Sequence, residues 1–127
     1  MKIASWNVNS IRVRLAQVLD WLESARPDVL GLQELKLPTE LFPEAEFSGR
    51  GYHAIVNGQK TYNGVALLSR QPAQDITYGM PDYPDDQARV ISASYGDLRV
   101  INVYVPNGQA VGTDKYDYKL AWLAALR

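Results

Sequence analysis

The chain has 127 residues, which is enough for one small domain with a hydrophobic core. Its composition is that of a folded globular protein, because 46% of the residues are hydrophobic and 21% are charged. With no cysteine and a single histidine, a disulfide framework and a thiolate zinc site are excluded, and a histidine-rich metal site is disfavoured. A formal net charge of −1 also argues against nucleic-acid binding over the whole surface.

Neither a signal peptide nor a membrane-spanning segment is expected. The start, MKIASWNVNS, has no long apolar run, and no later stretch approaches the length of a transmembrane helix. We therefore expect a soluble, cytoplasmic protein without a membrane partner.

The first 25 residues predict a strand followed by a helix. The strand covers residues 2–7, and after a turn Ser10 is placed to cap a helix that stops before Pro27. The helix is predicted from apolar residues at helical spacing, namely Ile11, Leu15, Val18, Leu19 and Leu22.

Residues 27–36, PDVLGLQELK, predict a buried strand that ends in polar side chains. Because a strand–helix–strand unit joins parallel strands, Asn7 and Glu34 are expected to emerge at the same carboxyl edge of the sheet. Ligands commonly bind at that edge, and a carboxylate there is a candidate ligand for a hard cation. Taken alone, this stretch favours the simpler interpretation of a solvated loop charge.

The later residues predict mainly strands. Residues 38–50 are expected to form an irregular surface loop with at most one short helical turn. Five strands follow, over residues 52–56, 64–69, 76–78, 89–95 and 98–104. The last two are expected to form a hairpin around a two-residue turn at Gly96.

A final helix is predicted after the cap residue Thr113. Its expected apolar stripe consists of Tyr116, Leu120, Leu123 and Ala124. The sequence stops at Arg127 without a capping signal, which indicates a chain that was cut within this helix or that has lost a partner half.

Five stretches occur in a recognisable order: KIASWNVNSIR, PDVLGLQELK, GQKTYNGVALLS, QARVISA and INVYVPNG. Together they resemble the exonuclease III family of abasic-site endonucleases, which belongs to the endonuclease/exonuclease/phosphatase superfamily. One motif alone is weak, but LQELK together with GQKTYNGVALLS favours the exonuclease III branch. The match covers nearly all of this chain and about the first half of the family's catalytic domain. The visible departure is Leu35, where the family commonly has threonine.

The resemblance implies an α/β fold. We expect half of a four-layered, DNase I-like α/β sandwich, with a mixed β-sheet and flanking helices. Residues 1–127 would form the N-terminal half of an endonuclease/exonuclease/phosphatase domain and would contribute about one sheet. Half a sandwich would expose a large apolar face, so we expect it to bind the missing C-terminal half or to self-associate.

The resemblance also implies an active site. Glu34 corresponds to the family's metal-binding glutamate and Asn7 to its active-site asparagine. One carboxylate with a few further oxygen ligands suits Mg²⁺, with Mn²⁺ as an alternative. Tyr104 aligns with an active-site tyrosine, whose phenol can donate to a phosphate oxygen. Ordinary local roles stay open, because Asn7 also suits the turn into the helix and Tyr104 is one of eight tyrosines.

Several cations are candidates for phosphate contacts, which position DNA without reading its sequence. Arg89 resembles the family's phosphate-contacting arginine, and Lys36 and Lys60 are further candidates. Asn9 and Asn107 are also candidate site residues, although hydrogen bonding within turns explains both equally well. For each cation the alternative is an ordinary solvated surface charge.

By this resemblance, the parent protein would be a Mg²⁺-dependent DNA repair phosphodiesterase. It would act on double-stranded DNA at abasic sites and 3′ ends, as an endonuclease and a 3′–5′ exonuclease. The family's Asp-x-Asn motif, later aspartate and terminal Asp-His pair do not follow Tyr104 here, so we expect the chain alone to be inactive or nearly so. Two alternatives stay open: a phosphatase or phosphodiesterase acting on inositol or lipid phosphates, and a non-catalytic fragment that binds DNA or a partner polypeptide.

Overall fold

The computed structural model describes residues 1–80, 85, 87–106 and 114–126. In chain order the elements are β1 (Ile3–Asn7), α1 (Ile11–Ala25), β2 (Val29–Gln33), the 3₁₀ turn η1 (Thr39–Leu41), α2 (Glu44–Ser48), β3 (His53–Asn57), β4 (Val65–Ser69), β5 (Gln74–Tyr78), β6 (Val90–Tyr95), β7 (Leu98–Val103) and α3 (Asp114–Leu126). Two sequence predictions, the candidate site residue Asn107 and the cap Thr113, lie outside the described residues.

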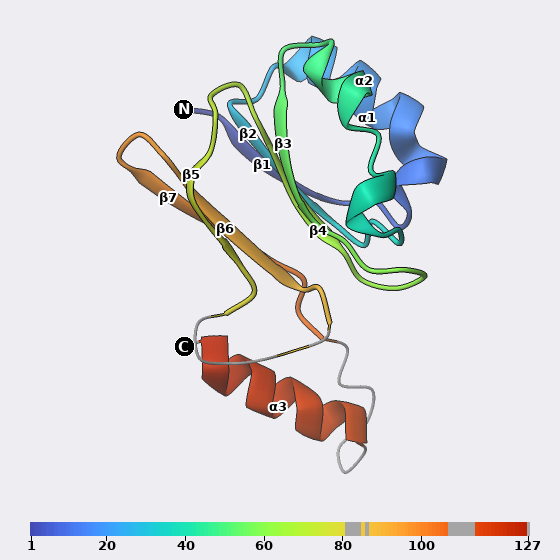
Figure 1. Cartoon of the computed structure of the whole chain (residues 1–127), viewed down its shortest axis with the longest axis vertical. Coiled ribbons are helices and arrows are strands. Elements are labelled where there is room, and N and C mark those ends of the chain that lie inside the picture. Colours follow the sequence, from blue (N-terminus) through green and yellow to red (C-terminus); the bar gives the residue numbers. More distant parts are fainter. Residues whose placement is uncertain (81–84, 86, 107–113, 127) are drawn as a thin grey trace.

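The strands form two sheets, not the single sheet that we expected (Figure 1). One is mixed and has the order β1-β2-β4-β3, with β1 and β2 parallel. The other is antiparallel and has the order β5-β6-β7. Helices α1 and α2 cover one face of the mixed sheet, and the antiparallel sheet covers the other face. The layers are therefore helix, sheet and sheet.

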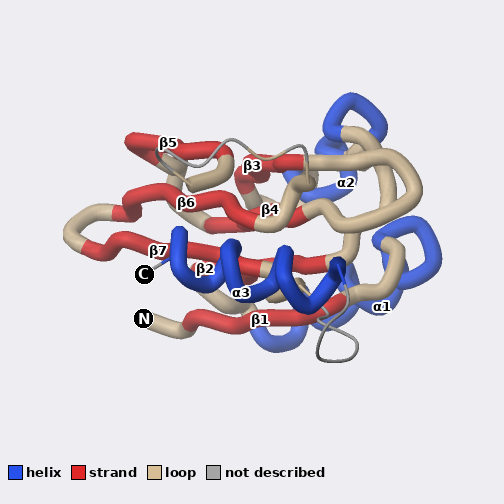
Figure 2. Tube along the Cα trace, turned by 90° about the horizontal axis from the view of Figure 1, so that it is seen from below, coloured by secondary structure: helices blue, strands red, loops and turns tan. Residues whose placement is uncertain are grey.

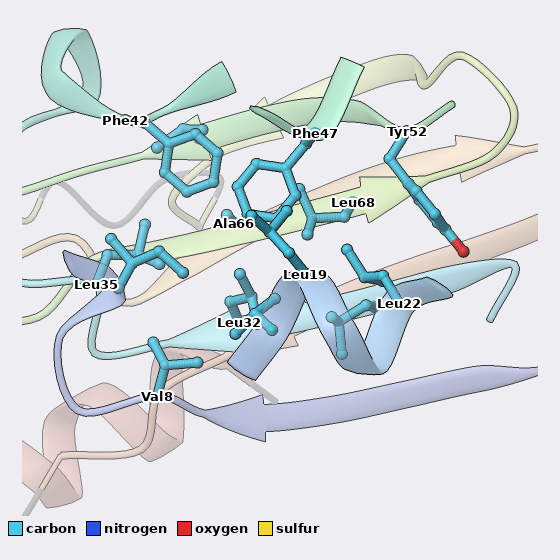
Figure 3. Packing of buried hydrophobic residues seen from close by; sticks show 14 of the residues in the cluster. Val8, Leu19, Leu22, Leu32, Leu35, Phe42, Phe47, Tyr52, Ala66 and Leu68 are labelled. Carbon is cyan, nitrogen blue, oxygen red and sulfur yellow. The ribbon is translucent and has the colours of Figure 1, made fainter. Parts of the chain in front are cut away.

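Two hydrophobic clusters hold these layers together. The larger lies between the mixed sheet and the helices, where Phe42 and Phe47 stack with ring centroids 5.3 Å apart (Figure 3). The smaller lies between the sheets, with Val29, Val65 and Leu67 buried against Ile91, Ala93 and Tyr95. The expectation that one sheet would leave a large apolar face exposed is therefore wrong for this face, because β6 and β7 cover it.

Helix α1 buries the predicted residues Ile11, Val18 and Leu22 completely. It ends as expected before Pro27. The predicted side-chain cap at Ser10 is wrong, because this residue has φ 87°, outside the extended region used by N-caps, and its side chain makes no capping bond. Its backbone N–H instead donates to the carbonyl of Glu34 at 2.8 Å.

Two helical features differ from the sequence prediction. Residues 38–50 contain α2 as well as the short turn η1, although Pro38 and Pro43 made the segment look irregular. Helix α3 is present, but its predicted apolar stripe is wrong: Leu120 and Leu123 are 50% and 38% exposed, whereas Trp122 is 1% exposed. Helix α3 lies apart from α1 and α2, below the sheets in Figure 1, and it therefore passes in front of the strands when viewed from below in Figure 2.

None of the helices in the described ranges combines the length and the apolar character needed to cross a membrane.

A buried side-chain amide joins the two sheets. The Nδ2 group of Asn102, in β7, donates to the carbonyls of Leu32 and Ala66 at 3.0 and 2.7 Å. Its Oδ1 accepts from Nε2 of Gln33 at 2.6 Å. Gly31 makes room for this contact, because a Cβ at that position would lie 3.1 Å from Cγ of Asn102. The amide therefore fixes the end of β2 from the opposite sheet.

Replacing this amide should destabilise the fold. We expect Asn102→Ala to lower the free energy of unfolding by about 2–4 kcal/mol, because buried polar partners lose their bonds and a cavity forms. Urea denaturation of the intact protein measures this loss. Asn57→Ala is the matched control, because the half-buried Asn57 donates one 3.0 Å bond, to the carbonyl of Val90. Equal losses in the two variants would contradict a special role for Asn102.

Candidate active site

A cavity of about 550 Å³ opens beside the carboxyl end of β2. Its walls come from the end of β2, the β3–β4 loop, the segments that precede β6 and follow β7, and helix α3. In that order the lining residues are Glu34 and Lys36; Gln59, Tyr62 and Asn63; Gln87 and Arg89; Tyr104 and Pro106; Lys115 and Tyr118. Segments that are far apart in the sequence thus meet around one space.

The predicted juxtaposition of Asn7 and Glu34 is present. Strands β1 and β2 pair in parallel with Asn7 opposite Gln33, so both residues leave the sheet at one edge. Asn7 is exposed, and its Oδ1 accepts from the backbone N–H of Asn9 at 3.1 Å, which is the local turn role left open above. Neither Asn7 nor Asn9 lines the cavity, although Asn9 accepts a hydrogen bond from Lys36, which does.

The backbone that presents Glu34 is held in an uncommon conformation. Glu34 and Lys36 have φ values of 58° and 60°, in the left-handed region that side chains other than glycine rarely adopt. Leu35, between them, is fully buried in the larger cluster (Figure 3). The alternation sends the two charged side chains to the cavity and the apolar one to the core. Such strain persists only where the surroundings over-determine it, and it is commonest at functional sites.

Backbone hydrogen bonds pin this segment to its neighbours. The N–H groups of Leu35 and Lys36 donate to the carbonyls of Gly64 and Asn63 at 3.2 and 3.0 Å. On the other side, the carbonyls of Glu34 and Leu35 accept from the first N–H groups of the α1 region. The carboxylate therefore extends from a rigid base.

Tyr104 and Glu34 are in direct contact. The phenol of Tyr104 donates to Oε1 of Glu34 at 2.8 Å. Burial raises the pKa of Tyr104 above its usual value of 10, the bond to Glu34 and the charge of Glu34 raise it further, and the charge of Arg89 opposes this. The phenol is thus protonated at neutral pH and serves as a hydrogen-bond donor.

Arg89 joins this pair in the same cavity. Its Nε donates to Oε1 of Gln87 at 2.8 Å, and its Nη1 donates to the carbonyl of Tyr104 at 3.2 Å. Lys36 also lines the cavity, and its Nζ group donates to Oδ1 of Asn9. Lys60 is exposed and does not line the cavity, so the structure does not bring this candidate to the site.

Several lining residues were missed from the sequence. Gln59 and Asn63 lie within the quoted GQKTYNG stretch, and Oε1 of Gln59 accepts from the backbone N–H of Ala88 at 2.7 Å and from Nδ2 of Asn63 at 3.0 Å. Lys115 and Tyr118 were missed because α3 presents to the cavity a face other than the predicted apolar stripe.

The oxygen donors suit a hard cation. No group of three or more histidine, cysteine, aspartate or glutamate side chains occurs among the described residues, so a full protein cage is not formed there. Glu34 uses Oε1 for Tyr104, and its Oε2 takes no hydrogen bond from the described part of the chain. Mg²⁺ is commonly held by one or two carboxylates, with waters and substrate phosphate completing the shell. Glu34 fits that pattern as the carboxylate ligand, and Asn7 leaves the sheet at the same edge.

Comparison with known proteins identifies the family. Residues 4–127 match the family described as Endonuclease/Exonuclease/phosphatase, and the chain belongs to it. Exodeoxyribonuclease III of Haemophilus influenzae is 43% identical over 115 residues, which cover 87% of this chain and 43% of that protein. The resemblance to the exonuclease III family predicted from the motifs is thereby confirmed.

Solved structures support the same assignment. The 3′ phosphatase NExo from Neisseria, solved with a product DNA hairpin, is 52% identical with a TM-score of 0.97. An AP endonuclease from Archaeoglobus fulgidus is 45% identical with a TM-score of 0.95. Each match covers 99% of this chain and 49% of the other chain. The predicted fold class is confirmed, and the chain spans about half the length of these structures.

Gly64 packs closely against Leu35, the residue that follows Glu34. Gly64 has φ +95°, and a Cβ there would lie 3.0 Å from Cβ of Leu35. We expect Gly64→Ala to lower the free energy of unfolding by about 2–4 kcal/mol, through both backbone strain and the clash with Leu35. Thermal or urea denaturation checks this.

Gly51→Ala is the matched control. Gly51 has a similar φ of +86°, but an added Cβ would meet nothing within 4 Å. It should lose only the strain component, about 1–2 kcal/mol. If both variants lose the same stability, the Leu35 contact does not fix the Glu34 segment.

Proposed function

We propose that this chain carries part of the active site of a Mg²⁺-dependent DNA repair phosphodiesterase. The intact protein would cleave double-stranded DNA at abasic sites and remove nucleotides from 3′ ends. The observation that carries the proposal is the contact between Tyr104 and Glu34, which lies beside Arg89 in one cavity. The names of the relatives, an exodeoxyribonuclease III and an AP endonuclease, point to the same chemistry.

The site residues would have different roles in phosphodiester hydrolysis. Arg89 and Lys36 would bind the negatively charged phosphate, Arg89 with its planar fork of N–H donors. Glu34, with Asn7, would hold the cation, and Mg²⁺ when bound would neutralise charge on the phosphate and stabilise the charge that develops at the reacting oxygens. Tyr104, whose phenol is protonated at neutral pH, would orient Glu34 through its one O–H donor, and it would donate to a phosphate oxygen only in exchange for this bond.

We also propose that this chain does not complete the site. Glu34 is the only acidic side chain among the described cavity residues, and no histidine lines the cavity. A group that activates water must therefore come from elsewhere in the intact protein, and we expect residues 1–127 alone to be inactive or nearly so. We propose that a C-terminal half of the intact protein is the source, and the solved relatives are about twice as long as the region that matches this chain.

The proposal is tested by incision of a labelled duplex that contains one abasic-site analogue. The intact protein should cut it in Mg²⁺ and not in EDTA, and the 127-residue chain should show little or no incision. We expect Glu34→Gln to reduce kcat/KM by about 100-fold or more, because the metal anchor loses its charge. Glu44→Gln, which alters an exposed carboxylate in α2, is the control and should leave the rate unchanged.

The same assay distinguishes the alternatives. Turnover of an inositol phosphate in preference to duplex DNA would replace the DNA proposal with a phosphatase function. Binding of duplex DNA by the intact protein without any Mg²⁺-dependent turnover would favour the non-catalytic alternative.

Tyr104→Phe tests the phenol. Loss of the donor should lower kcat by about 10–100-fold while the protein stays folded, because a preorganised hydrogen bond is removed. The control is Tyr52→Phe, since the phenol of Tyr52 donates to the carbonyl of Pro27 at 2.8 Å in the core and should affect stability alone. A Tyr104→Phe enzyme with wild-type kcat would exclude the proposed role.

A further inference from the structure

Arg89 lies between two tyrosine rings from distant parts of the chain. Its guanidinium carbon is 4.9 Å from the ring centroid of Tyr104 and 5.6 Å from that of Tyr118. Tyr104 follows β7, whereas Tyr118 belongs to α3. Both distances are within the range of cation–π attraction, which restricts a guanidinium group and partly replaces its hydration.

A closed set of contacts holds Tyr118 against Arg89. The phenol of Tyr118 donates to Oδ2 of Asp85, and Oδ1 of Asp85 accepts from the backbone N–H of Gln87 at 2.9 Å. The side chain of Gln87 then accepts from Nε of Arg89 at 2.8 Å. Burial raises the pKa of Tyr118, and the bond to Asp85 raises it further, so the phenol keeps its proton at neutral pH.

These contacts leave one side of Arg89 available. Nε and Nη1 are bonded to Gln87 and to Tyr104, while Nη2 donates no hydrogen bond within the described part of the chain. Arg89 also lines the cavity next to Glu34. A free arginine side chain would lose rotamer entropy on binding a phosphate. Here the two rings and Gln87 have already ordered it.

We propose that Tyr118 is a positioning residue that acts through Arg89 and pre-orders it for a substrate phosphate. This inference rests on the proposed function, since it assigns the phosphate contact of the same cavity. It makes α3 part of the phosphate-binding wall, although none of the α3 side chains that the structure describes contributes a carboxylate to that wall. The aromatic ring of Tyr118 makes the direct contact with Arg89, and the hydroxyl bond to Asp85 holds the ring in place.

The test is a double-mutant cycle in the intact protein. Binding of an abasic-analogue duplex is measured by fluorescence anisotropy in EDTA, and kcat and KM are measured separately in Mg²⁺. Tyr118→Leu should weaken binding and raise KM by about 5–20-fold with kcat within about twofold, the size of one cation–π contact and its ordering effect. Tyr118→Phe should restore most of the affinity, because it keeps the ring.

The energetic coupling between Tyr118 and Arg89 in duplex binding decides whether the proposal holds. In an Arg89→Ala background, Tyr118→Leu should weaken binding no further. Tyr78→Leu, which removes an exposed tyrosine on β5, is the control and should bind as wild type. Additive losses in the double variant, or a Tyr118→Phe variant as weak as Tyr118→Leu, would overturn the proposal.

The two proposals fail in different ways. Wild-type protein that cleaves the duplex but shows no coupling between Tyr118 and Arg89 overturns the positioning role alone. Protein that binds with coupling but does not cleave overturns the proposed function alone. Wild-type protein that does not bind the duplex at all overturns both.

Discussion

The side-chain amide of Asn102 is the contact on which the geometry of the site depends. It crosses from β7 to β2 and β4, and its three hydrogen bonds are buried between the two sheets. Unpaired buried amides are strongly disfavoured, so the two sheets meet in one register at this point. Glu34 directly follows the strand that Asn102 fixes, and Tyr104 follows Asn102 by two residues. The hydrogen bonds of Asn102 thus position both segments whose side chains form the contact between the Tyr104 phenol and the Glu34 carboxylate.

Local patterns predicted the parts of the site that depend on chain order. The helical spacing before Pro27 predicted α1, and the strand–helix–strand order placed Asn7 and Glu34 at one edge. Motif resemblance added Tyr104 and Arg89, which share a cavity with Glu34. The first two features depend on interactions between residues close in sequence. Tyr104 and Arg89 are brought to Glu34 by long-range packing, which only the family's motif pattern made predictable.

The predictions failed where packing between distant segments decides the outcome. Two sheets form because β6 and β7 pack across β2 and β4. The alternation of apolar and polar residues along a strand does not reveal which sheet the strand joins. Prolines around α2 obscured a helix that Phe42 and Phe47 stabilise by stacking in the core. Helix α3 was predicted with the wrong face, because Tyr118 contacts Arg89 and Trp122, one turn later, is buried, whereas the more apolar Leu120 is exposed.

The pairing of β6 with β7 also has a consequence for the fidelity of assembly. Asn102 and Tyr104 are two residues apart, so an extended chain directs them to the same face. A slip of one residue in the hairpin would turn both away from the mixed sheet together. A misregistered molecule would therefore lose the hydrogen bonds of Asn102 between the sheets and, with them, the correct placement of the Tyr104 phenol. The chain thus disfavours a stably folded species with a misassembled site, because correct folding and correct placement of Tyr104 depend on one register.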